Sequence, residues 1–258
     1  MEIKSKAVKD LVKAPSSCRS AEFYDRLMEG AETRGILGKE ARFNAMRISR
    51  TPSVQKYFAQ VVKPYLDPGY RVLDFGCGPG SFMAPIAAFC KEIIGVDISQ
   101  NFVSECEQMI HGLKIPNAGV IHIAPDHLPF EDGSFDALVL VDVIHHLENV
   151  ERSLKEAIRV IRPGGRVLIF EPNKLNPLIA LIHLFDRNEW GLLRLGTPGK
   201  YQTLLNPFMR IDGVSFNGIV IGPQSKLLYM ASDILNHPWV KPVAGWLNPK
   251  MFITGTKL

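Results

Sequence analysis

The fold of this chain is decided by the stretch Arg71-Val72-Leu73-Asp74-Phe75-Gly76-Cys77-Gly78-Pro79-Gly80. Its apolar first half predicts a strand buried on both faces, and the apolar spacing after Ser81 predicts a helix. Three glycines at alternate positions lie between them, so backbone N–H groups can approach a ligand with no Cβ in the way. Asp74 places a negative charge beside this turn, which would repel a phosphate and hold an ammonium group.

Strand and helix patterns alternate along the chain after this turn. Such alternation predicts an α/β protein with a parallel, doubly wound sheet and helices on both of its faces. The predicted strands lie at residues 92–97, 119–123, 137–141 and 166–170, and the predicted helices between them at 100–113 and 150–161.

A second carboxylate follows the next strand along the chain. Asp97 ends that strand and lies 17 residues beyond Gly80. A carboxylate at this position accepts hydrogen bonds from both hydroxyls of a ribose, so we expect an adenosine-containing cofactor. Ile98 would then pack on the face of the adenine. The alternative, a carboxylate that only caps the following helix, leaves the spacing from the glycines unexplained.

The glycine turn lacks the third glycine of a dinucleotide fingerprint, because Ser81 takes that position. The pattern D-x-G-x-G-x-G instead resembles the first motif of class I S-adenosylmethionine-dependent methyltransferases. In that family the glycine backbone cradles the methionine end of the cofactor, and the acidic residue contacts its amino group. The resemblance implies S-adenosylmethionine as the cofactor, contacted by Asp74, Gly76, Cys77, Gly78 and Gly80. A tight turn that binds nothing is the alternative.

A second motif, L-P-F-E-D-G-S-F-D, occupies residues 128–136. Together with the R-P-G-G turn at residues 162–165, it resembles the methyltransferase group that includes the quinone-biosynthesis enzymes. That group has two acidic residues before L-P-F, and the earlier one reads the amino group of adenine. Here the earlier position is Ala124, so the resemblance leaves the adenine contact to Asp126, or to the backbone of His127 and Leu128.

Two histidines follow the fourth strand, at an edge where open parallel sheets bind ligands. Val141 ends that strand and is expected to contact the cofactor. His146 stands four residues after Asp142, a spacing that resembles the catalytic region of phosphoethanolamine methyltransferases. There a tyrosine from an N-terminal lid pairs with the histidine, which implies a catalytic pair of His146 and Tyr24, unless Tyr24 is only a packing residue. Neighbouring histidines on one turn do not both face a pocket, so His145, His146 or neither acts as a base.

The resemblance also implies a seven-stranded, mostly parallel Rossmann-like sheet that ends in an antiparallel hairpin. Late strand patterns at residues 214–221 and 251–256 suit that hairpin. We expect a single domain over residues 1–258, with an apolar insert that is a substrate lid, a dimer interface or a core flap. Its expected parts are an N-terminal helical lid at 1–66, a cofactor-binding core at 67–173, the insert at 174–214 and closing strands at 215–258.

The composition bounds the class of protein. The 258 residues suffice for one large α/β domain, and the net charge of +4 is spread without a long basic run. Four cysteines without a C-x-x-C pair favour reduced thiols in a cytoplasmic protein. No apolar run is long enough to cross a bilayer, and the first 20 residues lack the apolar core of a secretory signal.

These observations favour a small-molecule or lipid-like acceptor, methylated by SN2 transfer at an O, N or C nucleophile. The chain lacks the N/D-P-P-Y/F tetrapeptide and the Pro-Cys nucleophile of nucleic-acid methylases, so no nucleic acid is expected as a partner. No metal is expected, because His122, Asp126 and His127 on one short loop are a weak set of ligands. A homodimer is possible. The rival hypothesis is a cofactor-binding protein without catalysis, whose insert contacts a partner.

Overall fold

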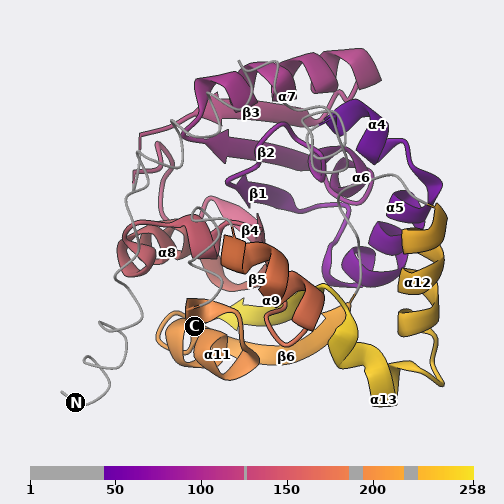
Figure 1. Ribbon diagram of the computed structural model, residues 1–258. Helices are drawn as coiled ribbons and strands as arrows, with labels where there is room; N and C mark the ends of the chain where they lie inside the picture. Colours follow the sequence, from indigo (N-terminus) through magenta and orange to yellow (C-terminus); the bar gives the residue numbers. More distant parts are fainter. Residues whose placement is uncertain (1–43, 125–126, 186–193, 218–225) are drawn as a thin grey trace.

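One seven-stranded sheet organises the chain, and helices cover both of its faces (Figure 1). The strand order is β3-β2-β1-β4-β5-β7-β6. Neighbouring strands are parallel except at β7, which runs antiparallel to both β5 and β6. The predicted doubly wound, mostly parallel sheet with antiparallel closing strands is therefore confirmed. The computed structural model describes residues 44–124, 127–185, 194–217 and 226–258.

The strands are β1 (Arg71–Phe75), β2 (Glu92–Asp97), β3 (Ala118–His122), β4 (Phe135–Val141), β5 (Ile161–Pro172), β6 (Met209–Asn217) and β7 (Lys250–Lys257). The described α-helices are α4 (Ala45–Ser49), α5 (Pro52–Tyr57), α6 (Met83–Ala87), α7 (Gln100–Leu113), α8 (Val150–Arg159), α9 (Pro177–Phe185), α11 (Pro198–Leu205), α12 (Lys226–Asn236) and α13 (Lys241–Ala244). Short turns of other helix types are η1 (Phe58–Val62), η2 (Lys63–Tyr65), η3 (Ile144–His146) and η5 (Gly245–Leu247).

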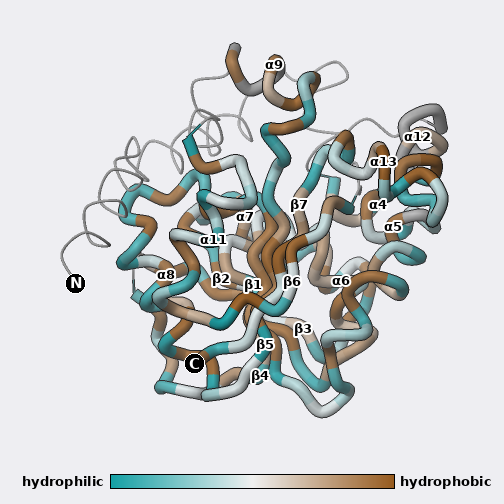
Figure 2. The backbone as a smooth tube through the Cα atoms, turned by 90° about the horizontal axis from the view of Figure 1, so that it is seen from below, coloured by the Kyte–Doolittle hydropathy of each residue, from teal (hydrophilic) through white to brown (hydrophobic). Residues whose placement is uncertain are grey.

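Two apolar clusters fill the space between the sheet and its helices. Val72 and Leu73 are adjacent on β1, fully buried, and point to opposite faces of the sheet. Val72 belongs to the cluster under α4 to α7, and Leu73 to the cluster under α8 and α11. Figure 2 shows the consequence, a band of hydrophobic strands through the middle of the molecule with hydrophilic segments around it. The prediction of a first strand buried on both faces is confirmed.

The described part of the predicted N-terminal lid packs against the sheet. Residues 44–66 contribute five buried apolar side chains to the same cluster as Val72: Ala45, Ile48, Val54, Phe58 and Val62. Burial of this kind stabilises each of the four larger side chains by about 1.5–3 kcal/mol relative to exposure. This segment is therefore part of the core, and residues 1–43, including Tyr24, lie outside the described residues.

The closing strand β6 begins earlier than its pattern suggested. It starts at Met209 rather than at residue 214, so the predicted insert 174–214 includes the first two thirds of this strand. The pattern missed the start because β6 is an edge strand, and Arg210 and Asp212 are exposed there. The rest of the insert holds α9 and α11, with residues 186–193 outside the described part.

Strand β5 also begins early, because the R-P-G-G segment forms a bulge within it. Phe135 of β4 pairs with Ile161, and two residues later Ala137 pairs with Arg166. Gly164 has φ of +72°, and a Cβ on Gly165 would lie 2.4 Å from a methyl carbon of Ile161 and 2.8 Å from a carbonyl oxygen. The glycines of this motif are therefore required by the bulge itself.

Several large apolar side chains are exposed on the helices after β5. They are Leu178, Leu181 and Leu184 on α9, Met230 and Ile234 on α12, and Trp239, Val243 and Trp246 around α13. Within the described part of the chain, no helix has the length and apolar character needed to cross a membrane.

The Gly165 contact leads to a prediction about stability. Gly165→Ala should lower the free energy of unfolding by about 1–3 kcal/mol, because backbone atoms that cannot move aside crowd the new methyl group. The matched control is Gly199→Ala on α11, where a Cβ meets nothing within 4 Å. Denaturant unfolding of both variants measures the difference, and equal stability of the two would contradict the assignment.

Candidate active site

The candidate active site lies at the carboxyl edge of the sheet, where β1 and β4 are neighbours. The strand order reverses at this point, since β2 and β3 lie beyond β1 while β5 to β7 lie beyond β4. In open parallel sheets the segments that leave two such strands diverge to opposite faces, and ligands bind in the crevice that this leaves at the carboxyl ends. The glycine turn after β1 and the histidine turn after β4 therefore meet at this point.

The glycine turn is held against β2 and against the histidine turn. Gly76 N–H donates to the carbonyl oxygen of Val96 at 2.8 Å. A Cβ on Gly76 would lie 2.6 Å from a methyl carbon of Val143, whereas a Cβ on Gly78 would meet nothing within 4 Å. The three glycines Gly76, Gly78 and Gly80 have φ of +73°, +52° and +84°, a region that disfavours any residue with a Cβ. Gly78 is therefore the glycine whose surroundings are open to a ligand.

The side chain of Cys77, between these glycines, faces the interior. It is buried, and a Cβ on Gly95 of β2 would lie 2.7 Å from its sulfur. A hydrogen bond with Cys106, and then burial, raise the pKa of the Cys77 thiol well above its usual value. A buried, protonated thiol is unreactive, so only the backbone of Cys77 is suited to contact a cofactor.

Asp74 is a buried carboxyl that has no compensating partner among the described residues. Only 2% of its surface is exposed, and its neighbours in register are Gly95 and Val139. Burial, and then repulsion from Asp97, raise the pKa of Asp74 to about 7, and no hydrogen bond or cation among the described residues opposes them. Burying a carboxylate without a donor is costly, so this position fits a ligand that brings a positive charge. The amino group of S-adenosylmethionine is such a charge.

Asp97 joins the glycine turn to the start of α7. Its Oδ2 accepts the N–H of Gly78 and its Oδ1 accepts the N–H of Ser99, both at 2.9 Å. Ser99 in turn caps α7, because its Oγ accepts the N–H of Phe102 at 3.2 Å. An ionised carboxylate offers about four acceptor positions, so this anchoring is compatible with a bond to a ribose hydroxyl. The ribose contact of Asp97 and the adenine contact of Ile98 stay predictions.

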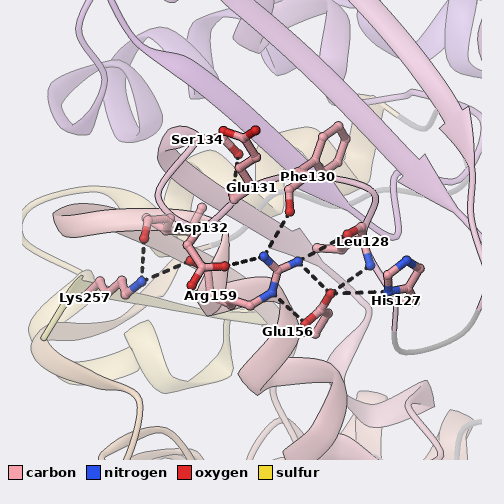
Figure 3. Close-up of polar contacts among 10 residues, drawn as sticks. His127, Leu128, Phe130, Glu131, Asp132, Ser134, Glu156, Arg159 and Lys257 are labelled. Atoms are coloured by element: carbon pink, nitrogen blue, oxygen red, sulfur yellow. Dashed lines mark hydrogen bonds and ion pairs between the residues drawn. The ribbon is translucent and has the colours of Figure 1, made fainter.

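The first half of the 128–136 motif is fastened to α8, as Figure 3 shows. The guanidinium of Arg159 donates to Asp132 at 2.5 Å and to the carbonyl oxygens of Phe130 and Leu128 at 2.9 and 3.2 Å. It also donates to both oxygens of Glu156, whose Oε1 accepts the N–H of Leu128. The hydrogen bonds from Arg159 lower the pKa of Glu156 to about 2. Glu156 is therefore ionised at neutral pH and remains paired with the guanidinium.

The second half of the motif is structural as well. Ser134 Oγ donates to the carbonyl oxygen of Glu131 at 2.8 Å and closes the turn before β4. Asp136 accepts the backbone N–H of Arg71 at 2.8 Å and the Nε–H of Arg162 at 2.7 Å. Arg71 is the first residue of β1 and Arg162 the second residue of β5, so Asp136 ties together the amino ends of these two strands. Asp132, Ser134 and Asp136 of the motif therefore hold the fold and do not face the crevice.

His127 lies at the edge of a separate hollow beside α8. This hollow has a volume of about 550 Å³, and its lining includes His127, Phe130, Glu156 and Arg159. Nδ1 of His127 is 3.9 Å from Oε1 of Glu156, and its side chain is largely exposed (Figure 3). Asp126 lies outside the described residues. The adenine contact assigned to Asp126 or His127 therefore stays a prediction.

Metal binding has no candidate cluster in the described ranges. No three His, Cys, Asp or Glu side chains come together there in a way that would hold an ion. His122 instead has its Nε2 3.1 Å from the carbonyl oxygen of Ile98.

The histidine turn begins with an unusual backbone conformation. Asp142 has φ of +58°, a left-handed value that is uncommon for a residue with a side chain. Its N–H donates to the carbonyl oxygen of Phe170 at 2.8 Å, and its carboxylate forms an ion pair with Lys250 at the start of β7. Half-buried Val141 precedes it and packs in the same cluster as Phe170. Strain that tertiary contacts maintain at a strand end is typical of functional sites.

A buried glutamate from β5 holds the rest of this turn. Glu171 Oε1 accepts the N–H groups of Val143 and Ile144 at 3.0 and 2.7 Å. Its Oε2 lies 2.5 Å from Nδ1 of His145 and accepts the hydroxyl of Tyr201 at 2.8 Å. Sequence reasoning missed this residue, and the one available signal was a charged residue at the end of an apolar strand.

Glu171 separates the roles of the two histidines. His145 is 3% exposed and lies against the buried carboxylate, so its ring belongs to the interior. His146 is half-buried, with its ring centroid 3.9 Å from that of His145. Of the two, His146 is therefore the candidate base, and its pairing with Tyr24 stays a prediction.

A seven-stranded sheet of this order, with a glycine turn at its switch point, is the class I methyltransferase fold. Residues 73–169 match the family model described as a methyltransferase domain. The demethylmenaquinone methyltransferase of Bacillus cereus strain B4264 is 30% identical over 112 residues, which are 42% of this chain and 47% of that protein. Residues 73–169 therefore correspond to a methyltransferase domain, and the sheet has the fold of S-adenosylmethionine-dependent methyltransferases.

Two solved structures show the same fold over almost the whole chain. One is geranyl diphosphate C-methyltransferase from Streptomyces coelicolor A3(2), solved in complex with S-adenosyl-L-homocysteine. Its TM-score is 0.61 at 14% identity, and the match covers 95% of this chain and 99% of that protein. The other is the cyclase SpnF, with a TM-score of 0.60 at 17% identity over 95% of this chain and 98% of that protein. The chain spans less than half the length of the curated relatives it matches.

The environment of Asp74 predicts a pH dependence of cofactor binding. The carboxyl must be ionised to hold an ammonium group, so the affinity for S-adenosylhomocysteine should fall as the pH drops through about 7, by about tenfold per pH unit. Asp74→Asn should bind more weakly and lose this dependence, while Glu107→Gln, an exposed change on α7, should keep it. Calorimetry between pH 5.5 and about 8 measures both, and a flat profile for the unchanged protein would refute the assignment.

Proposed function

We propose that this protein transfers a methyl group from S-adenosylmethionine to a small or lipid-like acceptor. The observation that carries the proposal is the buried carboxyl of Asp74, which has no cation beside it among the described residues. It lies beside the glycine turn, where the space next to Gly78 is free. A buried carboxyl in this state is unfavourable by itself and becomes favourable when a cationic ligand arrives. The methyltransferase domain assigned to residues 73–169 agrees with that ligand.

The chain's own residues bind and orient the cofactor in this proposal. Asp74 holds its amino group, the backbone at Gly78 approaches its methionine end, and Asp97 holds its ribose. S-adenosylmethionine supplies, when bound, an electrophilic methyl group on a positively charged sulfur. Because two reactants are aligned in one site, the arrangement contributes about 7–11 kcal/mol to lowering the barrier.

His146 would remove the proton from an acceptor that must lose one. It follows β4 at the crevice, and unlike His145 it is not enclosed with Glu171. A histidine suits this role because its ordinary pKa lies near neutral pH. A positioned base of this kind accelerates a reaction by about 10²–10⁴-fold.

An apolar acceptor is supported by the surface that follows β5. Leu178, Leu181 and Leu184 of α9 are each more than half exposed. Exposed apolar side chains in such numbers are typical of a surface that contacts an apolar molecule. The similarity to a demethylmenaquinone methyltransferase, a protein named for a quinone, agrees with an acceptor of this chemistry.

The fold alone does not decide the reaction, since a protein of similar TM-score is named a cyclase. The direct test is transfer of an isotopically labelled methyl group from S-adenosylmethionine into an apolar small-molecule extract. Formation of S-adenosylhomocysteine together with a labelled product supports the proposal. Tight S-adenosylhomocysteine binding without any labelled product would favour the rival hypothesis of a cofactor-binding protein.

His146→Ala should lower kcat by about 10²–10⁴-fold and leave S-adenosylhomocysteine affinity nearly unchanged, because the ring would act on the acceptor. The matched control is His111→Ala, which removes an exposed histidine from α7. Steady-state kinetics with calorimetry separate the two effects. If both variants keep the kcat of the unchanged protein, His146 is not the base.

Leu178→Asp should raise the KM for an apolar acceptor by about tenfold or more, because a charge then faces the apolar molecule. The control is Leu258→Asp at the end of the chain, where the side chain is also largely exposed. A change in mass in solution with unchanged acceptor kinetics would instead identify α9 as an interface between copies.

A further inference from the structure

One carboxylate organises the turn that presents His146. Glu171 is fully buried, and its two oxygens receive four contacts: the N–H groups of Val143 and Ile144, the ring of His145 and the hydroxyl of Tyr201. The first three partners immediately precede His146 in the chain. A residue that fixes three consecutive positions also fixes the direction in which the next side chain leaves.

The same turn is in contact with the glycine turn. Val143 fills the space that a Cβ of Gly76 would occupy, at 2.6 Å from its methyl carbon. Val143 therefore packs close to the backbone of Gly76 and leaves no room for a side chain there. The position of Glu171 consequently sets how the histidine turn and the glycine turn fit together.

Glu171 also reaches the segment after β5. Tyr201 lies on α11, is completely buried, and donates its hydroxyl to Oε2 of Glu171 at 2.8 Å. Leu204 and Leu205 on the same helix are buried in the cluster that contains Val143 and Ile144. The insert is therefore fastened to the histidine turn by one hydrogen bond and by apolar contacts around it.

The contacts keep the buried carboxylate charged. Burial alone would raise the pKa of Glu171, but the nearby His145 and the hydrogen bonds from His145, Tyr201 and Ile144 bring it below its usual value. Removing one donor leaves an acceptor position of the buried carboxylate unfilled, which costs more than the bond itself contributes.

We propose that Glu171 is a positioning residue that sets the orientation of His146 and couples the insert on α11 to the methyl-transfer site. The inference rests on the proposed function for His146, but its geometric part stands on the contacts of Glu171 alone. It assigns no chemistry to Glu171, because the carboxylate is enclosed and does not reach the crevice.

The test compares two changes at Glu171 with one change at a similar carboxylate elsewhere. Glu171→Gln keeps a carbonyl oxygen for the N–H groups of Val143 and Ile144, whereas Glu171→Ala keeps none. Asp136→Ala is the matched control, because Asp136 also accepts a backbone N–H and an arginine but lies at the amino edge of the sheet. Melting temperature, S-adenosylhomocysteine affinity, kcat and acceptor KM are measured for each.

We expect Glu171→Ala to lower kcat by about 100-fold, with partial rescue in Glu171→Gln and a smaller change in cofactor affinity. Asp136→Ala should lower the melting temperature and keep kcat. Tyr201→Phe should raise the acceptor KM more than it lowers kcat, because it releases only the insert. If Glu171→Gln loses melting temperature but keeps kcat and KM, as the control does, Glu171 is merely structural and the proposal is wrong.

Histidine ring NMR keeps the proposal testable if the proposed function fails. The unchanged protein and Glu171→Gln are compared without substrate, with S-adenosylhomocysteine bound. One set of His146 ring signals in the unchanged protein, and broadened or multiple sets in the variant, support positioning even if no methyl transfer is found. Identical His146 signals in both proteins would overturn it, whatever the activity.

Discussion

The hydrogen bonds that converge on the buried carboxylate of Glu171 are the interaction on which the candidate site depends. They join the end of β5, the turn after β4 and helix α11 at one point. Because a buried carboxylate is tolerated only when its acceptor positions are filled, each of these segments has little freedom to move alone. The contact of Val143 with Gly76 extends this constraint to the glycine turn.

Asp74 and Glu171 are both buried carboxyls, and their surroundings affect them in opposite ways. Donors surround Glu171 and keep its pKa low, whereas burial and Asp97 raise that of Asp74 to about 7. Glu171 therefore contributes stability above its unfolded pKa of about 4.3, which is lost only in acid. Asp74 contributes stability below about 3.9, which is lost as the pH rises through about 7 unless a cation is bound. One group supports the fold and the other favours a ligand.

The residues that carry the family resemblance also fall into two groups, those that support the fold and those that are placed to contact a ligand. The motif at 128–136 predicted the family correctly, yet Asp132, Ser134 and Asp136 fasten loops and strands and do not face the crevice. Proteins with different reactions can therefore share this motif, because it serves the fold. The proposed chemistry instead depends on the glycine turn and on the turn after β4, where Asp142 has a left-handed backbone conformation.

The sequence by itself determined the sheet, the glycine turn and the positions of Asp74 and Asp97, because burial patterns and spacing along a strand are local properties. It determined neither the start of β6, where an edge strand exposes polar residues, nor the role of Glu171. Glu171 meets His145 and Tyr201 from 26 and 30 residues away, and nothing in its own stretch indicates those partners. Only the tertiary structure decides whether a buried carboxyl is paired with hydrogen-bond donors or is left unpaired, because the donors come from segments that are distant in the chain.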